Sequence, residues 1–267
     1  MKKGVKIISL GSDPEVFLKK NSEFISSEVL GIPGDKYNPF KIVEGLSILK
    51  DNVMLEFNIP ISYTKEEFVN NIKESLLIIK DFLGNNIEIS EVCSVNFPIE
   101  QLMTEHAQTF GCEPDFNCWT LEINKAPCAK NKTLRTAGGH IHVGYENPDE
   151  YKSITLLRLM DLYLGVPSIL LDKDTERRKM YGKAGCYRFK HYGFEYRVLS
   201  NFWIFDSNLV SWVWESTEKV FDIYNNLSEK ELESFIKSFS KDVIKCINNS
   251  DKKLAEKLIK TENLLLV

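Results

Sequence analysis

The sequence predicts an α+β fold in which an antiparallel β-sheet carries helices packed on one face or at one end. Stretches with apolar residues at every second position, the pattern of half-buried strands, recur between residues 5 and 199. Capped stretches with helical spacing interrupt them, and most of the chain after residue 205 has the helical pattern. No repeat or linker divides the sequence. We therefore expect a single domain, 1–267, with a sheet-bearing part, 1–205, and C-terminal helices, 206–267.

Composition narrows the functional classes. With 267 residues, 43% of them hydrophobic, the chain is long enough to bury a full core. Its net charge of −4 argues against a general nucleic-acid binder, because affinity for phosphate backbones requires a basic surface. The nearest approach to a membrane span, 162–171, contains Gly165 and Pro167 and falls short of the ~18 residues required. We expect no binding to nucleic acid or membrane.

Six cysteines without any CxxC spacing predict reduced thiols and a cytoplasmic protein. A zinc site built from Cys112, Cys118 and Cys128 is the alternative, although structural zinc usually takes short, paired spacings. Near the N-terminus, two lysines precede an apolar run, 5–10, that is too short for a signal peptide. This run is expected to be the first strand.

The next two predicted strands carry acids. Residues 11–18 alternate so that Asp13 and Glu15 share one face. A loop rich in glycine and proline follows, and in the strand expected at 51–60 Glu56 and Asn58 share a face opposite apolar residues. Both strands thus present a carboxylate where a core would hold hydrocarbon.

Helix signals are strongest at residues 64–84, where Thr64 and Glu67 match a capping box and Gly84 marks the end. A second helix is expected to start at Asn147, as N-cap before a proline, and to reach about residue 164, where Gly165 and Pro167 break or kink it. Residues 88–95 have a strand pattern and 101–110 that of a loop or short helix. The remaining expected helices are 209–225, 228–248 and 250–260.

The most informative stretch is Gly138–Gly139–His140–Ile141–His142. As a strand, its side-chain period of two sends His140 and His142 to the same face. Such neighbours lie ~7 Å apart, which suits one metal and one adjacent anion better than two ligands of a single ion. The glycines permit a bulge or the close approach of another segment or a ligand. For His140 a purely structural role is the alternative.

Four predicted strands place a candidate metal ligand in an interior position: Glu15, Glu56, His140 and Glu195. A buried carboxylate is costly unless it is paired or bound to a metal, so four such strands in one sheet indicate divalent cations. Carboxylates with one imidazole suit Mg²⁺ or Mn²⁺. The alternative for each glutamate is an amphipathic strand whose acid faces water.

A cationic stretch, 177–197, complements these acids. Arginine can hold phosphate oxygens bidentately, and the glycines in this stretch let the backbone approach a ligand closely. Arg188 and Arg197 alternate with aromatic and apolar residues on expected strands, whereas a solvated surface is equally compatible with the run 177–179. Acids and arginines together indicate nucleotide triphosphate chemistry, without a P-loop or a dinucleotide-binding turn.

Five segments of the sequence resemble the phage-type carboxylate-amine ligases, type 2, of the glutamine-synthetase-like group that includes glutamate-cysteine ligase: 11–15, 55–60, 111–115, 138–144 and 181–197. The most specific parts are the Gly-Gly-His-x-His strand and the Glu-x-Arg strand at Glu195–Arg197. The resemblance covers about residues 5–205, and the C-terminal helices carry none of it.

This resemblance implies a curved antiparallel sheet that forms an open funnel, with helices on its outer face, ATP at one end, the carboxylate substrate at the other and Mg²⁺ (or Mn²⁺) between them. By motif position it implies metal binding by Glu15, Glu56, His140, Glu195 and Asp115, with Glu113 as the alternative to Asp115. Nucleotide binding is expected from His142, Arg178, Lys183 and Arg188. Direct roles in catalysis are expected for Arg188, Glu195 and Arg197, and substrate contacts for Asn58 and Arg135.

The expected function is ATP-dependent amide formation, in which a small-molecule or peptide carboxylate is phosphorylated and an amine displaces the phosphate. Two alternatives stay open: a metal-dependent hydrolase that uses His140 and His142, and a non-catalytic nucleotide- or peptide-binding module with the same fold. The sequence has no counterpart of the N-terminal domain with which glutamine synthetases complete their active sites between subunits. Their ring assembly is therefore not implied, and the oligomeric state stays open.

Overall fold

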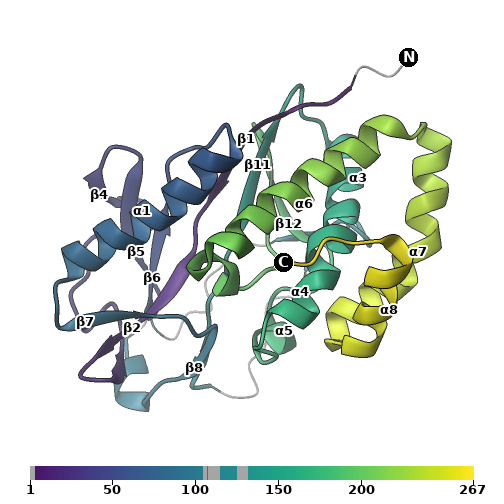
Figure 1. Ribbon diagram of the computed structural model, residues 1–267. Coiled ribbons are helices and arrows are strands. Elements are labelled where there is room, and N and C mark those ends of the chain that lie inside the picture. The colour runs from purple at the N-terminus through teal and green to yellow at the C-terminus, as the bar shows by residue number, and fades with distance from the viewer. Residues whose placement is uncertain (1–3, 105–106, 108–114, 125–131) are drawn as a thin grey trace.

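The computed structural model describes residues 4–104, 107, 115–124 and 132–267, and in this part of the chain a curved antiparallel sheet is covered on its outer side by helices (Figure 1). The predicted α+β class is confirmed. The strands are β1 (Ile7–Ser12), β2 (Glu15–Lys20), β3 (Glu23–Ile25), β4 (Phe40–Val43), β5 (Leu46–Asp51), β6 (Met54–Asn58), β7 (Ile87–Ser90), β8 (Ser94–Asn96), β9 (Phe116–Asn117), β10 (Leu134–Thr136), β11 (Ile141–Tyr145), β12 (Cys186–Lys190) and β13 (Gly193–Tyr196).

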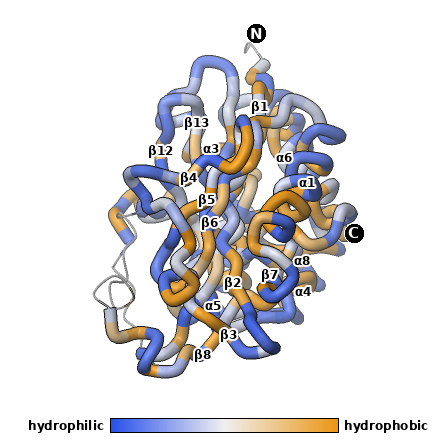
Figure 2. Tube along the Cα trace, turned by 90° about the vertical axis from the view of Figure 1, so that its left-hand side faces the viewer, coloured by the Kyte–Doolittle hydropathy of each residue, from blue (hydrophilic) through white to orange (hydrophobic). Residues whose placement is uncertain are grey.

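Along the chain, the helices lie between the strands and after the last strand. They are α1 (Lys65–Leu83), η1 (Ile99–Leu102), α3 (Glu150–Met160), η2 (Asp161–Gly165), α4 (Val166–Leu171), α5 (Arg177–Met180), η3 (Asn201–Phe205), α6 (Ser207–Asn226), α7 (Glu229–Asn249) and α8 (Lys252–Glu262). Figure 2 shows α1, α4, α6 and α8 on one side of the molecule, with β4, β12 and β13 on the other. The helices thus cover one side of the sheet and leave the opposite side for a site.

The sheet has two halves, with strand orders β1-β11-β13-β12-β9 and β3-β2-β6-β5-β4. Strands β1 and β2 follow each other directly and join the halves. Strand β6 continues across the junction, because the amide of Phe57 donates to the Pro14 carbonyl and that of Ile59 to Ser12. The sequence predicted one strand over 11–18. Instead the chain leaves strand geometry at Asp13–Pro14, where proline supplies no donor.

Helix α1 begins and ends where the sequence predicted. Thr64 accepts from the Glu67 amide and the Glu67 side chain returns to the Thr64 amide, which completes the capping box. Gly84, at φ 77°, follows the last turn. The apolar stripe of the helix is buried, and Phe68 stacks on Trp203 of η3 with ring centroids 5.8 Å apart. This contact fixes α1 against the segment that follows β13.

The central helix differs from its prediction at both ends. Its N-cap is Asp149, whose side chain accepts from the Lys152 amide, and not Asn147, which has a positive φ of 49°. The helix does not break at Gly165. It continues through one π-helical turn, η2, into α4, so that the expected interruption is absorbed by wider winding.

This continuous helix, Glu150–Leu171, is long and apolar enough by composition to cross a membrane, but 78% of its most apolar stretch is buried inside the molecule. It is therefore the central helix of the core. Its burial among α6, α7 and the strands β12 and β13 gives the site strands a firm support.

Two further predicted strands differ from those in the structure. Residues 88–95 form two short strands, β7 and β8, in different sheets, rather than one. The strand expected at 51–60 is instead a hairpin in which Asp51 ends β5 and Asn52, at φ 57°, begins the turn into β6. The C-terminal helices agree with their prediction, including the capping box of Ser228 and Glu231 on α7.

Candidate active site

Glu15, Asp51 and Glu56 form a cluster that we call the acid triad. Their carboxylate oxygens lie within 4.8 Å of one another. Glu15 and Glu56 are direct cross-strand partners on β2 and β6. Asp51 lies two residues beyond Leu49, the cross-strand partner of Glu56 on β5, and so faces the same side of the sheet. Strand pairing alone therefore brings the three acids together.

Asp13, His140 and Glu195 form a second cluster, here called the histidine triad, with ligand atoms again within 4.8 Å of one another. The Nδ1 atom of His140 lies 3.2 Å from an oxygen of Asp13 and 3.5 Å from one of Glu195. Asp13 comes from the junction of the two sheet halves, His140 from the residue before β11 and Glu195 from β13. The cluster therefore depends on the bend between β1 and β2.

The register of the sheet aligns a row of functional side chains. His142 pairs with Gly11 of β1 and with Glu195 of β13, and Arg188 of β12 pairs with the same glutamate. His142 also lies 3.1 Å from the second oxygen of Asp13. Both histidines therefore lie on one face, as predicted, with the Asp13 carboxylate between them.

The two predicted glycines allow close packing behind His140. A Cβ atom on Gly138 would overlap the His140 ring, and one on Gly139 would lie 2.6 Å from the Ser200 carbonyl oxygen and 2.7 Å from Trp203. The Gly138 amide donates to the Glu15 carboxylate at 2.6 Å. A larger residue at either position would displace the strand that connects the two triads.

The pKa values of the acids are shifted in opposite directions in the two triads. Burial raises the pKa of Glu15 and Asp51, and it raises the pKa of Glu56 well above its usual value with help from the neighbouring acids Asp13, Asp51 and Glu15. In the histidine triad, burial also favours the neutral acids, but cations outweigh it. Arg197 and the two histidines lower the pKa of Glu195 to about 2, and His142 and His140 hold that of Asp13 well below its usual range.

Glu195 is completely buried and contacts several cations. Arg197 donates to one of its oxygens, and Lys190 lies 3.0 Å from the other. Arg188 is more distant, at 3.9 Å. Arg197 is itself buried and contacts Asp115 at 3.5 Å and His140 at 3.3 Å. A guanidinium group is thus fixed beside both triads.

A tyrosine holds the outer histidine. The hydroxyl of Tyr192, in the turn between β12 and β13, lies 2.7 Å from Nδ1 of His142, and the two rings stack at 6.1 Å. The other ring nitrogen of His142 faces Asp13 at 3.1 Å. The contacts with Tyr192 and Asp13 on its two nitrogens therefore fix the orientation of the ring.

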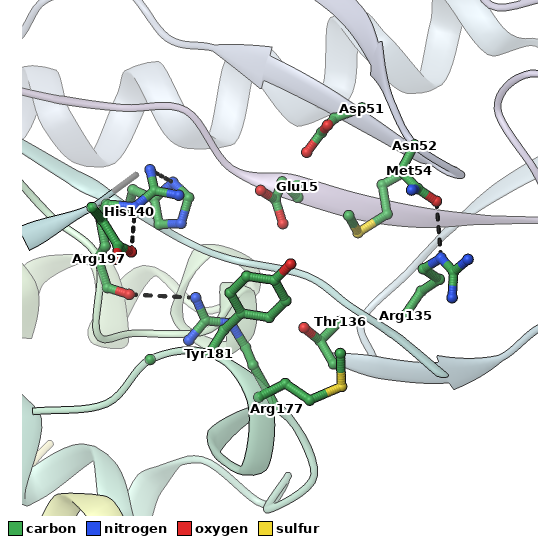
Figure 3. Close-up of a pocket in the computed structure, with 13 residues that line it drawn as sticks. Glu15, Asp51, Asn52, Met54, Arg135, Thr136, His140, Arg177, Tyr181 and Arg197 are labelled. Carbon is green, nitrogen blue, oxygen red and sulfur yellow. Dashed lines mark hydrogen bonds and ion pairs between the residues drawn. The ribbon is translucent and has the colours of Figure 1, made fainter. Parts of the chain in front are cut away.

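A pocket opens beside these clusters (Figure 3). Glu15 and Asp51 lie along one wall, while Arg177, Tyr181 and Thr136 lie along the opposite wall. Arg197 and His140 line it as well. The pocket thus connects the acid triad to a wall that carries positive charge.

Three residues predicted to bind nucleotide or substrate have other partners in the structure. Arg178 is buried against Ser168 at 2.7 Å and Asp172 at 3.6 Å, and the Lys183 ammonium donates to the Asn248 carbonyl. The Asn58 side chain bonds to backbone atoms of Gly45 and Ser47 near the start of β5. These three are not brought into either triad.

Arg135 lines the pocket, but its guanidinium donates to Asn52 and to the carbonyl oxygens of Lys132, Leu134 and Ala107. It therefore holds β10 against the β5–β6 turn.

Glu113, Cys112 and Cys128 lie outside the described residues, and Cys118 is a buried free thiol. A solvated surface is ruled out for Arg177 and Arg178, which are both buried.

Sequence reasoning missed several contributors: Asp13 and Asp51 as members of the triads, Lys190, Tyr192 and Arg177. Asp13 had a signal, because it shares a face with Glu15. Asp51 could have been found from the Asn52 turn, which reverses the chain and places it opposite the Glu56 strand. For the others, only the fold brings them to the site.

The donor sets fit divalent cations. The acid triad offers only carboxylate oxygens, the preferred ligands of Mg²⁺ and Mn²⁺. The histidine triad adds one imidazole, which Mn²⁺ accepts readily. Burial raises the pKa values of Asp51 and Glu56 although Arg197 acts in the opposite direction, so the positive charge of the protein compensates these acids only in part and a bound cation would supply the rest.

The family model of the phage phiEco32-like COOH.NH2 ligases, type 2, matches residues 129–264. The chain belongs to this family. The match includes His140, His142, Arg188, Glu195 and Arg197, but it also extends over α6, α7 and all of α8. The expectation that the C-terminal helices carry no resemblance was therefore wrong. A search of curated proteins found no match.

Proposed function

We propose that this carboxylate-amine ligase depends on ATP and forms an amide bond through an acyl phosphate. The observation that carries the proposal is a single pocket lined by Glu15 and Asp51 of the acid triad, His140 of the histidine triad and one buried arginine, Arg197. Both triads have a geometry that could hold a cation. Such a combination favours phosphoryl transfer, because charge must be balanced on the transferred group without direct covalent help from the protein. Membership in a ligase family supports the same reaction class.

The reaction has two steps. An oxygen of the substrate carboxylate forms a bond to the γ-phosphorus of ATP, the bond to the bridging oxygen breaks, and ADP leaves. The nitrogen of the amine then bonds to the acyl carbon and loses a proton, while inorganic phosphate leaves with the electrons of the broken C–O bond. Mg²⁺ or Mn²⁺ bound at the triads would supply charge neutralisation on the phosphate oxygens.

The residues of the chain orient the reactants and balance charge. Arg197 is held by Glu195 and Asp115, so its guanidinium needs little rearrangement to face a phosphoryl group. Tyr192 fixes His142, and His142 fixes Asp13. Arg188 and Lys190, on the far side of Glu195, provide further positive charge for a nucleotide.

The proposal is tested by measuring ADP release with Mg²⁺ and ATP while amino acids, short peptides and amines are supplied in pairs. We expect ADP only when a suitable carboxylate is present, with an amine-dependent product that contains the new amide. Product formation without nucleotide would favour a metal-dependent hydrolase. Tight binding of Mg-ATP with no ADP release from any pair would favour a non-catalytic binding module.

A further inference from the structure

Arg177 is a buried cation without a carboxylate partner in the described part of the chain. Only 4% of the residue is exposed. Its guanidinium donates to the carbonyl oxygens of Val198 at 3.0 Å and Arg197 at 3.4 Å, and no described carboxylate lies within 4 Å of it. The next residue, Arg178, does reach an acid, Asp172. Glu15 and Asp172 attract Arg177 but lie beyond ion-pair distance. A buried charge is costly unless it is paired, so an anion bound in the pocket would complete the pairing of Arg177.

The backbone of the pocket wall is shaped to accommodate this guanidinium. Gly182 lies against it with a φ of 66°, and a Cβ atom at this position would overlap the Arg177 Nη1 atom. Glycine therefore serves two purposes here, since it adopts the left-handed conformation and leaves room for the arginine. Arg177 is thus held in place at the pocket wall.

Thr136 presents a polar group that has no hydrogen-bond partner among the described residues. The residue is only 7% exposed and lines the same pocket, and its Oγ1 atom has no hydrogen-bond partner among the described residues. Buried hydroxyl groups in native proteins are nearly always bonded, and an unmade bond lowers stability. Figure 3 shows Thr136 beside Tyr181, on the wall that also carries Arg177. Both groups can donate to an oxyanion.

We propose that Arg177 and the hydroxyl of Thr136 form the subsite that binds the carboxylate substrate, opposite the acid triad. This inference rests on the proposed ligase function and assigns its acyl-donor site. An oxyanion could also be a nucleotide phosphate, but two observations favour the carboxylate. Met54, Met180 and Tyr181 line the pocket and offer apolar contacts for a hydrocarbon stem. Of the three cations near Glu195, Arg197 lines the pocket, but Arg188 and Lys190, which would add charge for a phosphate, are not among the described residues that line it.

The test compares Thr136→Val with Ser216→Ala. Valine keeps the shape of threonine and removes the unpartnered hydroxyl. Ser216 is the matched control, because its Oγ atom is also buried without a described partner, but it lies on α6 away from the pocket. Both substitutions are expected to leave the melting temperature unchanged or to raise it by about 2–4 °C, since each removes a desolvated hydroxyl.

Only Thr136→Val is expected to raise KM for the carboxylate, by about tenfold, because it loses a hydrogen bond to a charged group. KM for ATP should stay unchanged in both variants. Unchanged carboxylate KM in Thr136→Val would overturn the inference, and a change confined to the KM for ATP would assign the subsite to phosphate instead. The wild-type rate of ADP release tests the ligase function separately.

A binding measurement applies even without turnover, with sulfate as the oxyanion probe. Sulfate should raise the melting temperature of the wild-type protein more than that of Arg177→Gln, and comparison of the two removes the general salt effect. Thr136→Val should show an intermediate increase, and Ser216→Ala the full one. Equal increases in wild type, Arg177→Gln and Thr136→Val would contradict an anion subsite at this wall.

Discussion

The acid triad and the histidine triad use similar residues but balance their charge differently. In the acid triad, burial and mutual repulsion raise the pKa values of Glu15, Asp51 and Glu56. In the histidine triad the same forces act, yet nearby cations lower the pKa of Glu195 to about 2. The difference is the supply of protein cations, because Arg197 and Lys190 both contact Glu195 directly.

The two clusters therefore compensate the negative charge of their buried carboxylates in two different ways. The histidine triad is compensated by the protein and can hold its shape with its own charges. In the acid triad the only described ion-pair or hydrogen-bond donor to a carboxylate is the Gly138 amide, which bonds to Glu15. A divalent cation or protons must provide the rest. Substitutions should therefore affect the two clusters in different ways.

Glu195→Gln should have the largest effect, with loss of ADP release by at least about 1000-fold. Removal of this charge leaves Arg197 and Lys190 without their shared carboxylate and removes a candidate metal ligand. The measurement is single-turnover ADP formation, with circular dichroism to confirm folding. Glu215→Gln is the control, since Glu215 is exposed and pairs only with Lys65 among described residues. Retention of amine-dependent ADP release in Glu195→Gln would show that the metal assignment is wrong.

Asp51→Asn should stabilise the metal-free protein but weaken metal binding. It removes one of three repelling charges, so the melting temperature without metal should rise by a few degrees. Affinity for Mn²⁺, followed by electron paramagnetic resonance of the free ion, should fall at least about tenfold because one ligand is lost. The exposed Asp222→Asn on α6 provides a control for the change in net charge. Unaltered Mn²⁺ affinity would remove Asp51 from the site.

Much of the fold could be predicted because local rules and tertiary contacts agree. The capping boxes at Thr64 and Ser228 and the apolar stripe of α1 each specify a helix from nearby residues. The central helix differs because its burial compensates for the unfavourable Gly165 and Pro167, and a π-helical turn absorbs the irregularity. A local rule could not include that burial.

The candidate site could be predicted only where the alternation of side chains along a strand determines which residues share a face. The common face of His140 and His142 follows from the period of two, and both do contact Asp13. Lys190 and Tyr192 were missed because their roles depend on the β12–β13 hairpin, which brings them next to Glu195 and His142. Arg178 shows the reverse case. Its sequence context suggested phosphate binding, but the buried acid Asp172, six residues earlier, is its partner.

The pH dependence of stability should distinguish the triads. The folded pKa values of the acid triad lie above their unfolded values, so the folded state binds more protons and stability decreases as pH rises through this window. Asp13 and Glu195 behave oppositely: their contribution is present above the unfolded pKa and is lost as pH falls through the folded one, about 2 for Glu195. The pKa of His142 is also raised, because attraction to Asp13 outweighs its burial, and it acts in the same direction as the acid triad. Without metal, the melting temperature should therefore rise by a few degrees from about pH 8 to about pH 5.

Addition of Mg²⁺ isolates the contribution of the acid triad. Protons and the cation compete for the same carboxylates, so the increase in melting temperature caused by Mg²⁺ should be larger at pH 8 than at pH 5. Asp161, whose pKa burial raises to about 7, contributes equally with and without Mg²⁺ and cancels from this difference. An increase independent of pH would mean that Mg²⁺ does not bind at the acid triad.

Tyr192→Phe should have the smallest effect, confined to the histidine triad. It removes the hydroxyl that lies 2.7 Å from His142 but keeps the stacked ring, so the imidazole stays near Asp13 with a less defined orientation. Loss of one hydrogen bond predicts a rise in KM for ATP of about fivefold, with little change in melting temperature. Tyr151→Phe, at an exposed position on α3, is the control. Because His142 contacts Asp13 and not the acid triad, Mn²⁺ affinity of the acid triad should stay unchanged. A parallel loss of that affinity would mean that the two clusters act as one unit.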